Sequence, residues 1–271
     1  MKKKNMDNDK KFNTISNIYM FLVNMFLFLP ILAVVRASFS TTKSTTRPVG
    51  FSTQWYAKLF VNRDLWSALS NTLVLAISSM VLAVLLGTLI AFGMYKYKFK
   101  GKNTIDTLFY IPIIIPEIVL GIALMTMFSI LSIGSGMKTL IIAHTTFCIP
   151  YVVFNVKASI AGFDHSVEEA SMDLGANRIQ TFYNITLPMI FPGIKSGAFM
   201  AFTLSIDDVI ISYFTSGPGS VTLPIKVMSM VKRGITPDVN AMATIIMLIV
   251  LLMLIVSQLN IKERIKMRKA K

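Results

Sequence analysis

The stretch EEASMDLGANRIQTFYNITLP, residues 168–188, is charged and polar, whereas the whole chain is 54% hydrophobic and only 15% charged. Gly175 predicts the end of a short helix at about Leu174, because glycine readily adopts the left-handed backbone that closes helices. A second short helix is expected over about 178–184, and Pro188 and Pro192 mark the entry into the following apolar run. Because long ordered loops are uncommon without a function, the stretch predicts a rigid surface for docking a cytoplasmic partner.

Six apolar runs surround this stretch, and each is near the length of about 20 residues that crosses a bilayer as a helix. Backbone groups in lipid must be satisfied internally, and the runs are too long and continuous for the alternating strands of a β-barrel. We therefore expect an all-α membrane protein. Its six transmembrane helices are expected at roughly 17–35, 69–94, 107–131, 139–156, 190–213 and 240–260.

The basic residues give an orientation to these expected spans. With the N-terminus inside, the inner segments hold 18 lysines and arginines and the outer segments hold 9. This bias predicts that both termini are cytoplasmic, although the outer segment 36–68 alone carries five basic residues. The expected organisation is a basic tail at 1–16, a six-span domain over 17–260 that includes the inner segment 164–188, and a basic tail at 261–271.

The first apolar run and the net charge each have a second interpretation. The run from Ile18 to Val35 is longer than a usual signal-peptide core, so we expect it to be a retained first span. The formal charge of +14 lies mostly beside expected membrane helices, where basic residues hold topology and contact anionic lipid. Nucleic acid is therefore not an expected partner.

Motifs for enzyme chemistry do not occur in the sequence. No run has the G-x-x-x-x-G-K-[ST] pattern of a phosphate-binding loop, so ATP hydrolysis would require another subunit. His144 and His165 are far apart in the sequence and do not form a set of metal ligands with cysteines or paired carboxylates, and His144 is expected to be a packed helix residue. An intramembrane serine protease is disfavoured, because the GSG at 134–136 falls in an expected turn.

Three carboxylates lie within the expected spans: Glu117, Asp207 and Asp208. A charge at bilayer depth costs at least about 2.5–3.5 kcal/mol, and such residues usually face a bundle interior or a wet cavity. Pro112 and Pro116 precede Glu117 and predict a bend in the third helix.

Asp207 and Asp208 point about 100° apart on a helix, so only one of them can face a central path. The other is expected to make a helix–helix hydrogen bond, and the sequence leaves open which is which. No lysine or arginine lies deep in any expected span, so acids lining a path favour a cationic cargo. Tyr213 adds an aromatic face that is suited to ammonium groups.

Fixed residues within 168–188 resemble a known motif. Glu169-Ala170-Ser171, then Gly175 after three residues and Ile185-Thr186-Leu187-Pro188 after nine more, resemble the EAA motif of ABC-importer permeases. Ser171 replaces a common second alanine. FTLSIDDVIISYFTSGP at 202–218 and LPIKVMSMVKRGITPDVNAMATI at 223–245 resemble the second permease subunit of spermidine/putrescine importers.

The resemblance implies a type I ABC-importer permease bundle with a cytoplasmic coupling helix, in the cell (inner or plasma) membrane. It also implies four kinds of partner: a paralogous permease subunit, two ATPase subunits, an extracytoplasmic substrate-binding protein and a polyamine. The chain would hold no cofactor, and the ATPase subunits would bind ATP and Mg. The coupling residues would be Glu169, Ala170, Ser171, Gly175, Ile185, Leu187 and Pro188, and the substrate path would include Glu117, Asp207, Asp208 and Tyr213.

Two alternatives stay open at this point. An ABC importer for another small solute would share the motif, and the sequence does not separate spermidine from putrescine. A secondary transporter driven by an ion gradient would use the carboxylates as proton sites. The segment 164–188 counts against the second alternative, because such a transporter has no reason to carry a docking surface for an ATPase.

Overall fold

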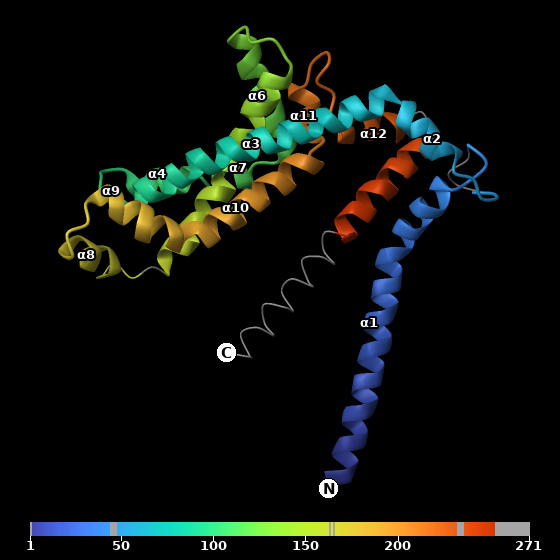
Figure 1. The fold of residues 1–271 in the computed structure, drawn as a ribbon, viewed down its shortest axis with the longest axis horizontal. Coiled ribbons are helices and arrows are strands. Elements are labelled where there is room, and N and C mark those ends of the chain that lie inside the picture. The colour runs from blue at the N-terminus through green and yellow to red at the C-terminus, as the bar shows by residue number, and fades with distance from the viewer. Residues whose placement is uncertain (1, 44–47, 163, 165, 232–235, 253–271) are drawn as a thin grey trace. The chain divides into compact units, whose positions relative to one another are not determined.

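The computed structural model describes residues 2–43, 48–162, 164, 166–231 and 236–252. Regular structure in these ranges is helical, and Figure 1 shows the helices along the chain. The chain divides into two compact units, one of Met1–Leu65 with Met230–Lys271 and one of Trp66–Ser229. The second unit holds all the residues that the sequence singles out for function.

The first unit contains α1 (Lys2–Ser38) and α2 (Gln54–Val61). Polar and aromatic groups hold the connection between them. The indole nitrogen of Trp55 donates to the carbonyl of Ser40 at 2.5 Å, and the rings of Phe39 and Phe51 stack with centroids 5.1 Å apart. Buried Trp55 therefore serves local packing in this unit.

The second unit holds the rest of the labelled helices, although α3 begins and α12 ends a few residues beyond its limits. Their bounds are α3 (Arg63–Lys96), α4 (Lys102–Leu108), α5 (Ile111–Ile114), α6 (Glu117–Ile130), α7 (Met137–Ala161), α8 (Ser166–Asp173), α9 (Arg178–Thr181), the π-helix η1 (Phe182–Thr186), α10 (Leu187–Asp207), α11 (Ile210–Thr215) and α12 (Leu223–Val231). Within this unit, α8 and α9 lie at one end, far from α6 and α11 (Figure 1).

Several helices are long and apolar enough to cross a membrane, as the sequence predicts. Among the described residues these are Ser16–Ser38, Arg63–Lys96, Met137–Ala161 and Arg178–Asp207. A shorter apolar helix covers Pro237–Leu252. The expected last span, 240–260, and the tail 261–271 lie partly or wholly outside the described residues, so the number of six spans stays a prediction.

The expected third span is broken. Helices Lys102–Ile114 and Glu117–Ile130 are bent by 107° relative to each other. Ile115 takes an extended backbone, because the ring of Pro116 disfavours a helical conformation in the residue before it. The predicted bend is confirmed, and it places Glu117 in the first turn of α6.

The core of the second unit forms around α7, whose buried side chains include Phe147, Val152, Val153 and Val156. Glycines bring the neighbouring helices close to it. A Cβ added at Gly193 of α10 would lie 2.6 Å from the carbonyl oxygen of Asn155. Small residues at such contacts let membrane helices gain close backbone packing.

Gly193→Ala should therefore destabilise the protein by about 1–3 kcal/mol, the usual cost of overpacking a close contact. The expected result is a lower melting temperature in detergent. Gly93→Ala is the matched control, because nothing lies within 4 Å of a Cβ added there. Equal melting temperatures for the two variants would show that the α7–α10 contact tolerates a methyl group.

Candidate functional site

The segment between α7 and α10 begins with α8, which ends as the sequence predicts. Gly175 has a φ of +92°, the left-handed conformation that favours glycine. Its N–H donates to the carbonyl of Met172 at 2.9 Å, and the N–H of Ala176 donates to that of Ser171 at 3.2 Å. This pair of bonds is a Schellman motif, which satisfies carbonyls at the end of the helix.

A capping box starts the next helix immediately afterwards. The side chain of Asn177 accepts from the N–H of Gln180 at 2.9 Å, and the side chain of Gln180 accepts from the N–H of Asn177 at 2.8 Å. The hydroxyls of Ser171 and Thr181 lie 3.3 Å apart and link α8 to α9. The corner between the two helices is therefore held at both ends by hydrogen bonds.

The sequence predicts that the second short helix ends at about residue 184, but the helix continues beyond Pro188. Helix α9 continues through η1 into α10, so that Arg178–Asp207 forms one long helical segment. Proline in the first turn of α10 lacks an N–H, and the preceding turn is widened, with Leu187 N–H bonding to the carbonyl of Phe182. Pro188 thus lies at the entry into the span, as expected, but the short helix before it runs on into the span without a break.

The motif residues differ in their exposure. Glu169, Ala170, Gly175 and Pro188 are exposed, whereas Ser171, Ile185 and Leu187 are half-buried. Apolar side chains are also open on this segment: Leu174 is 90% exposed, Ile179 69% and Tyr183 62%. We call Leu174, Ile179 and Tyr183 the coupling face.

A groove of about 590 Å³ lies beside this face. Its lining comes from the end of α3 and from the segment α8–η1, and includes Phe92, Lys96, Met172, Arg178, Ile179 and Tyr183. Apolar and basic groups, together with the acidic Glu168, thus meet at an open surface. Such a surface is suited to a protein partner rather than to a small solute.

Sequence reasoning missed Glu168, the residue just before the motif. Its side chain is buried and forms an ion pair with Lys96, with Nζ and Oε2 at 2.7 Å. The available signal was the doubled glutamate at 168–169 together with the lysines that end the second apolar run. One of two adjacent acids on a helix points inward when the other faces solvent.

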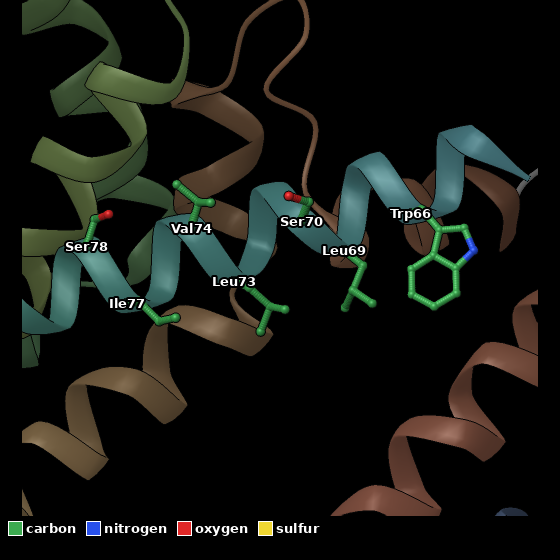
Figure 2. Close-up of a pocket in the computed structure, with 7 residues that line it drawn as sticks. All are labelled: Trp66, Leu69, Ser70, Leu73, Val74, Ile77 and Ser78. Atoms are coloured by element: carbon green, nitrogen blue, oxygen red, sulfur yellow. The ribbon is translucent and has the colours of Figure 1, made fainter. Parts of the chain in front are cut away.

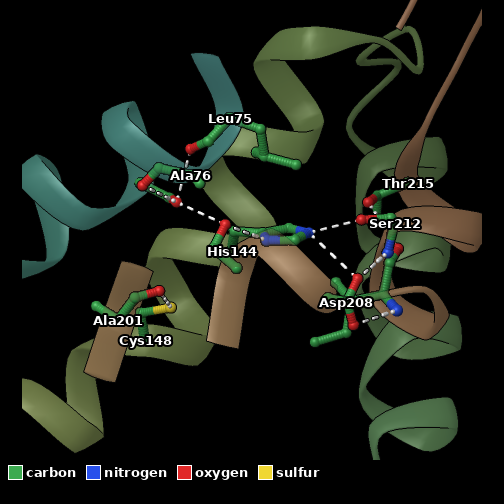
Figure 3. Close-up of polar contacts among 11 residues, drawn as sticks. Leu75, Ala76, His144, Cys148, Ala201, Asp208, Ser212 and Thr215 are labelled. Carbon is green, nitrogen blue, oxygen red and sulfur yellow. Dashed lines mark hydrogen bonds and ion pairs between the residues drawn. The ribbon is translucent and has the colours of Figure 1, made fainter. Parts of the chain in front are cut away.

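A buried polar network joins α3, α7, α10 and α11 (Figure 3). His144 lies at its centre, with Nδ1 2.8 Å from the hydroxyl of Ser205 and Nε2 2.9 Å from the hydroxyl of Ser212. The hydroxyl of Ser79 on α3 extends the network to Ser205 at 3.0 Å. The prediction that His144 is a packed residue is confirmed.

Asp208 belongs to the same network and lies at the break between α10 and α11. Its carboxylate accepts the N–H groups of Ile211 at 3.2 Å and Ser212 at 2.7 Å, as a helix N-cap does. The same carboxylate lies 3.4 Å from Nε2 of His144 (Figure 3). Asp208 is only 8% exposed, and groups of the same chain already contact both oxygens of its carboxylate.

The other acids point outward. Asp207 ends α10 and is exposed, and Glu117 begins α6 and is also exposed. Tyr213 on α11 is 67% exposed. Of the two adjacent aspartates, Asp207 is therefore the one available to a solute. Asp208 makes the helix-contact hydrogen bonds that the sequence assigns to one member of the pair.

A second cavity, of about 400 Å³, follows one face of α3 (Figure 2). It is lined by Trp66, Leu69, Ser70, Leu73, Val74, Ile77 and Ser78. These side chains carry no charge and repeat at the helical spacing of an apolar stripe. The cavity therefore suits apolar surface and is not a candidate site for a charged solute.

The family comparison covers most of the chain. Residues 83–262 match the model of the family described as binding-protein-dependent transport system inner membrane component. The spermidine/putrescine transport system permease protein PotC of Escherichia coli (strain K12) is 38% identical over 248 residues, which is 92% of this chain and 94% of PotC. The putrescine transport system permease protein PotI of the same strain is 40% identical over 229 residues, 82% of each chain.

Solved structures agree in fold. A bacterial ABC transporter that imports the acidic polysaccharide alginate matches with a TM-score of 0.75 and 14% sequence identity, over 93% of this chain and 96% of that one. An amino acid ABC transporter matches with a TM-score of 0.53 over 77% of this chain and 94% of that one. The chain is therefore a transporter permease subunit and belongs to the family of binding-protein-dependent transport system inner membrane components.

Proposed function

We propose that this chain is a membrane subunit of an ATP-driven importer of polyamines and forms half of the translocation path. The observation that carries the proposal is similarity of 37–40% to permease proteins named for spermidine and putrescine, across most of their length. A feature of this chain supports the proposal independently, because the exposed carboxylates of the second unit are suited to a cationic solute.

The physical basis is the cost of moving ammonium groups out of water. A linear polyamine loses hydration at each ammonium when it enters a path of low dielectric constant, and a carboxylate or an aromatic face offsets that loss. Glu117, Asp207 and Tyr213 are proposed as such stations. Weak sites in series also allow the cargo to leave, which a single deep site would not.

ATP would be hydrolysed by two partner subunits that hold ATP and Mg, since this chain carries no phosphate-binding loop in its sequence. We assign the docking of these subunits to the coupling face and the exposed Glu169. A rigid helical corner passes displacement on, whereas a flexible loop would absorb it. The ion-gradient alternative loses its support, because the family is one of binding-protein-dependent systems.

Two further partners follow from the proposal. A second permease subunit, paralogous to this one, would complete the path, because one bundle encloses no path by itself. An extracytoplasmic substrate-binding protein would deliver the polyamine. A solved alginate transporter with 18% sequence identity is described in complex with a periplasmic protein.

Uptake of labelled spermidine and putrescine tests the function directly. Cells that lack their own polyamine uptake would receive the complete transporter, with either the native ATPase or an ATPase variant that binds but does not hydrolyse ATP. We expect the transporter with the native ATPase to take up at least one polyamine, and the transporter with the ATPase variant to take up neither. No uptake of either polyamine from a fully assembled transporter would refute the proposed cargo.

The orientation is proposed to have both termini inside. Single cysteines at Lys43, Lys98, Lys226 and Lys266, in a Cys148→Ser background, would be treated with an impermeant thiol reagent on intact cells. We expect labelling at positions 43 and 226 only, because basic residues are enriched in the segments assigned to the inner side. Labelling at 98 or 266 in intact cells would reverse the assignment.

A further inference from the structure

Helix α8 is anchored in an unusual way. A short helix normally packs through apolar side chains, but the buried residue of α8 is Glu168, which is 4% exposed. Val167 and Met172 on the same helix are each 37% exposed. The contact of α8 with α3 and η1 therefore depends on a carboxylate, in addition to the hydroxyl contact between Ser171 and Thr181 of α9.

That carboxylate joins three elements. Oε2 of Glu168 accepts from Nζ of Lys96, the last residue of α3, at 2.7 Å. Oε1 accepts from the hydroxyl of Thr186, the last residue of η1, at 2.5 Å. Both oxygens are thus used, and each bond has the short length expected when one partner is charged.

On the basis of the proposed function, we propose that Glu168 is a positioning residue. It fastens α8 to the end of α3 and to the turn that leads into α10. When a partner ATPase displaces α8, the displacement then reaches two membrane helices together. The neighbouring Glu169 is exposed and stays free to contact that partner.

The reason lies in the cost of separating a buried carboxylate from its partners, since the Glu168 side chain is 5% exposed and that of Lys96 is 39% exposed. Apolar side chains slide past one another at little cost, because their attraction has no direction. A buried carboxylate that loses its partner keeps its charge without compensation, which is strongly unfavourable. Helix α8 therefore cannot move away from Lys96 or Thr186 without drawing their helices with it.

The test uses the complete transporter in lipid nanodiscs with its binding protein. Glu168→Gln keeps the shape but removes the charge, and Lys96→Gln removes the other half of the pair. We expect both variants to assemble and to keep basal ATP hydrolysis. Polyamine-stimulated hydrolysis and polyamine moved per ATP should fall by at least about tenfold, because a charge-assisted bond is lost.

The reversed pair, Lys96→Glu with Glu168→Lys, restores opposite charges at the same two positions. It should recover most of the lost transport per ATP. A matched control is Asp106→Asn, which breaks the ion pair between Asp106 and Lys157 of α4 and α7 without touching α8. This control should keep the transport per ATP of the unmodified transporter.

Several outcomes would overturn the proposal. One is unmodified transport per ATP in both single variants, and another is a reversed pair as defective as either single change. Lower amounts of assembled transporter with unchanged transport per ATP would show a purely structural role. The proposed polyamine function is judged separately, by uptake through the unmodified transporter.

Discussion

Replacing Glu117 with Gln and Asp207 with Asn in one chain should lower polyamine uptake by at least about tenfold. Each amide keeps the size of the carboxylate but cannot neutralise a desolvated ammonium, and hydrogen bonds to charged groups contribute about 1.5–3 kcal/mol each. Both residues are exposed on their helices, so the changes should leave the fold intact. The measurement is initial uptake of labelled polyamine at matched amounts of assembled transporter.

Asp208→Asn is the informative comparison. From sequence alone, this variant competes with Asp207→Asn as the one that removes a cation station. In the structure, the Asp208 carboxylate accepts the N–H groups of Ile211 and Ser212 and contacts His144. Asparagine keeps one acceptor oxygen but leaves one of these buried N–H groups without its partner, so the variant should chiefly lower stability, by about 1–3 kcal/mol. We expect a lower melting temperature and less assembled transporter. Normal uptake by the Glu117 and Asp207 double variant would refute the proposed stations.

The second large effect is expected at the corner of the coupling segment. Gly175→Val should release the ATPase subunit or abolish transport, because a β-branched residue is strained at a φ of +92°. Leu174→Asp should act similarly without straining the backbone, since it places a charge on a side chain that is 90% exposed. Glu169→Lys tests the polar part of the same surface. Recovery of the ATPase on purification and uptake are the two measurements.

Gly101→Val provides the matched control for the corner. Gly101 also has a left-handed backbone, with a φ of +88°, and nothing lies within 4 Å of a Cβ added there. The same strain is thus introduced outside the coupling segment. If Gly101→Val releases the ATPase as fully as Gly175→Val does, the effect arises from general destabilisation and the docking assignment fails.

Much of the fold could be predicted from periodicity and from helix-breaking residues. The long apolar runs, the bend before Glu117 and the end of α8 at Gly175 all follow from local chemistry. The helix at the expected fifth span, 190–213, has different limits from that apolar run. The helix begins earlier because a π turn accommodates Pro188, and it ends at Asp207 because the side chain of Asp208 caps the next helix.

The candidate site was only partly predictable, because burial depends on partners that are distant in sequence. Asp207 and Asp208 are adjacent and chemically identical. Asp208 differs through its contact with His144, more than 60 residues away, as well as through the N–H groups of α11 that it accepts. Glu168 differs from Glu169 in the same way, through Lys96 on α3. A hydropathy pattern predicts neither the contact of Asp208 with His144 nor that of Glu168 with Lys96.

The π turn at Phe182–Thr186 also sets the phase between the two parts of its long helix. A π turn takes up one residue more than an α-helical turn, and one residue corresponds to about 100° of rotation. A single regular helical wheel drawn through Arg178–Asp207 therefore misassigns the faces on one side of the turn. Loss of one residue between Phe182 and Thr186 would remove this offset and turn the coupling face to a different side of the bundle. The length of the motif, as well as its residue types, is thus under structural constraint.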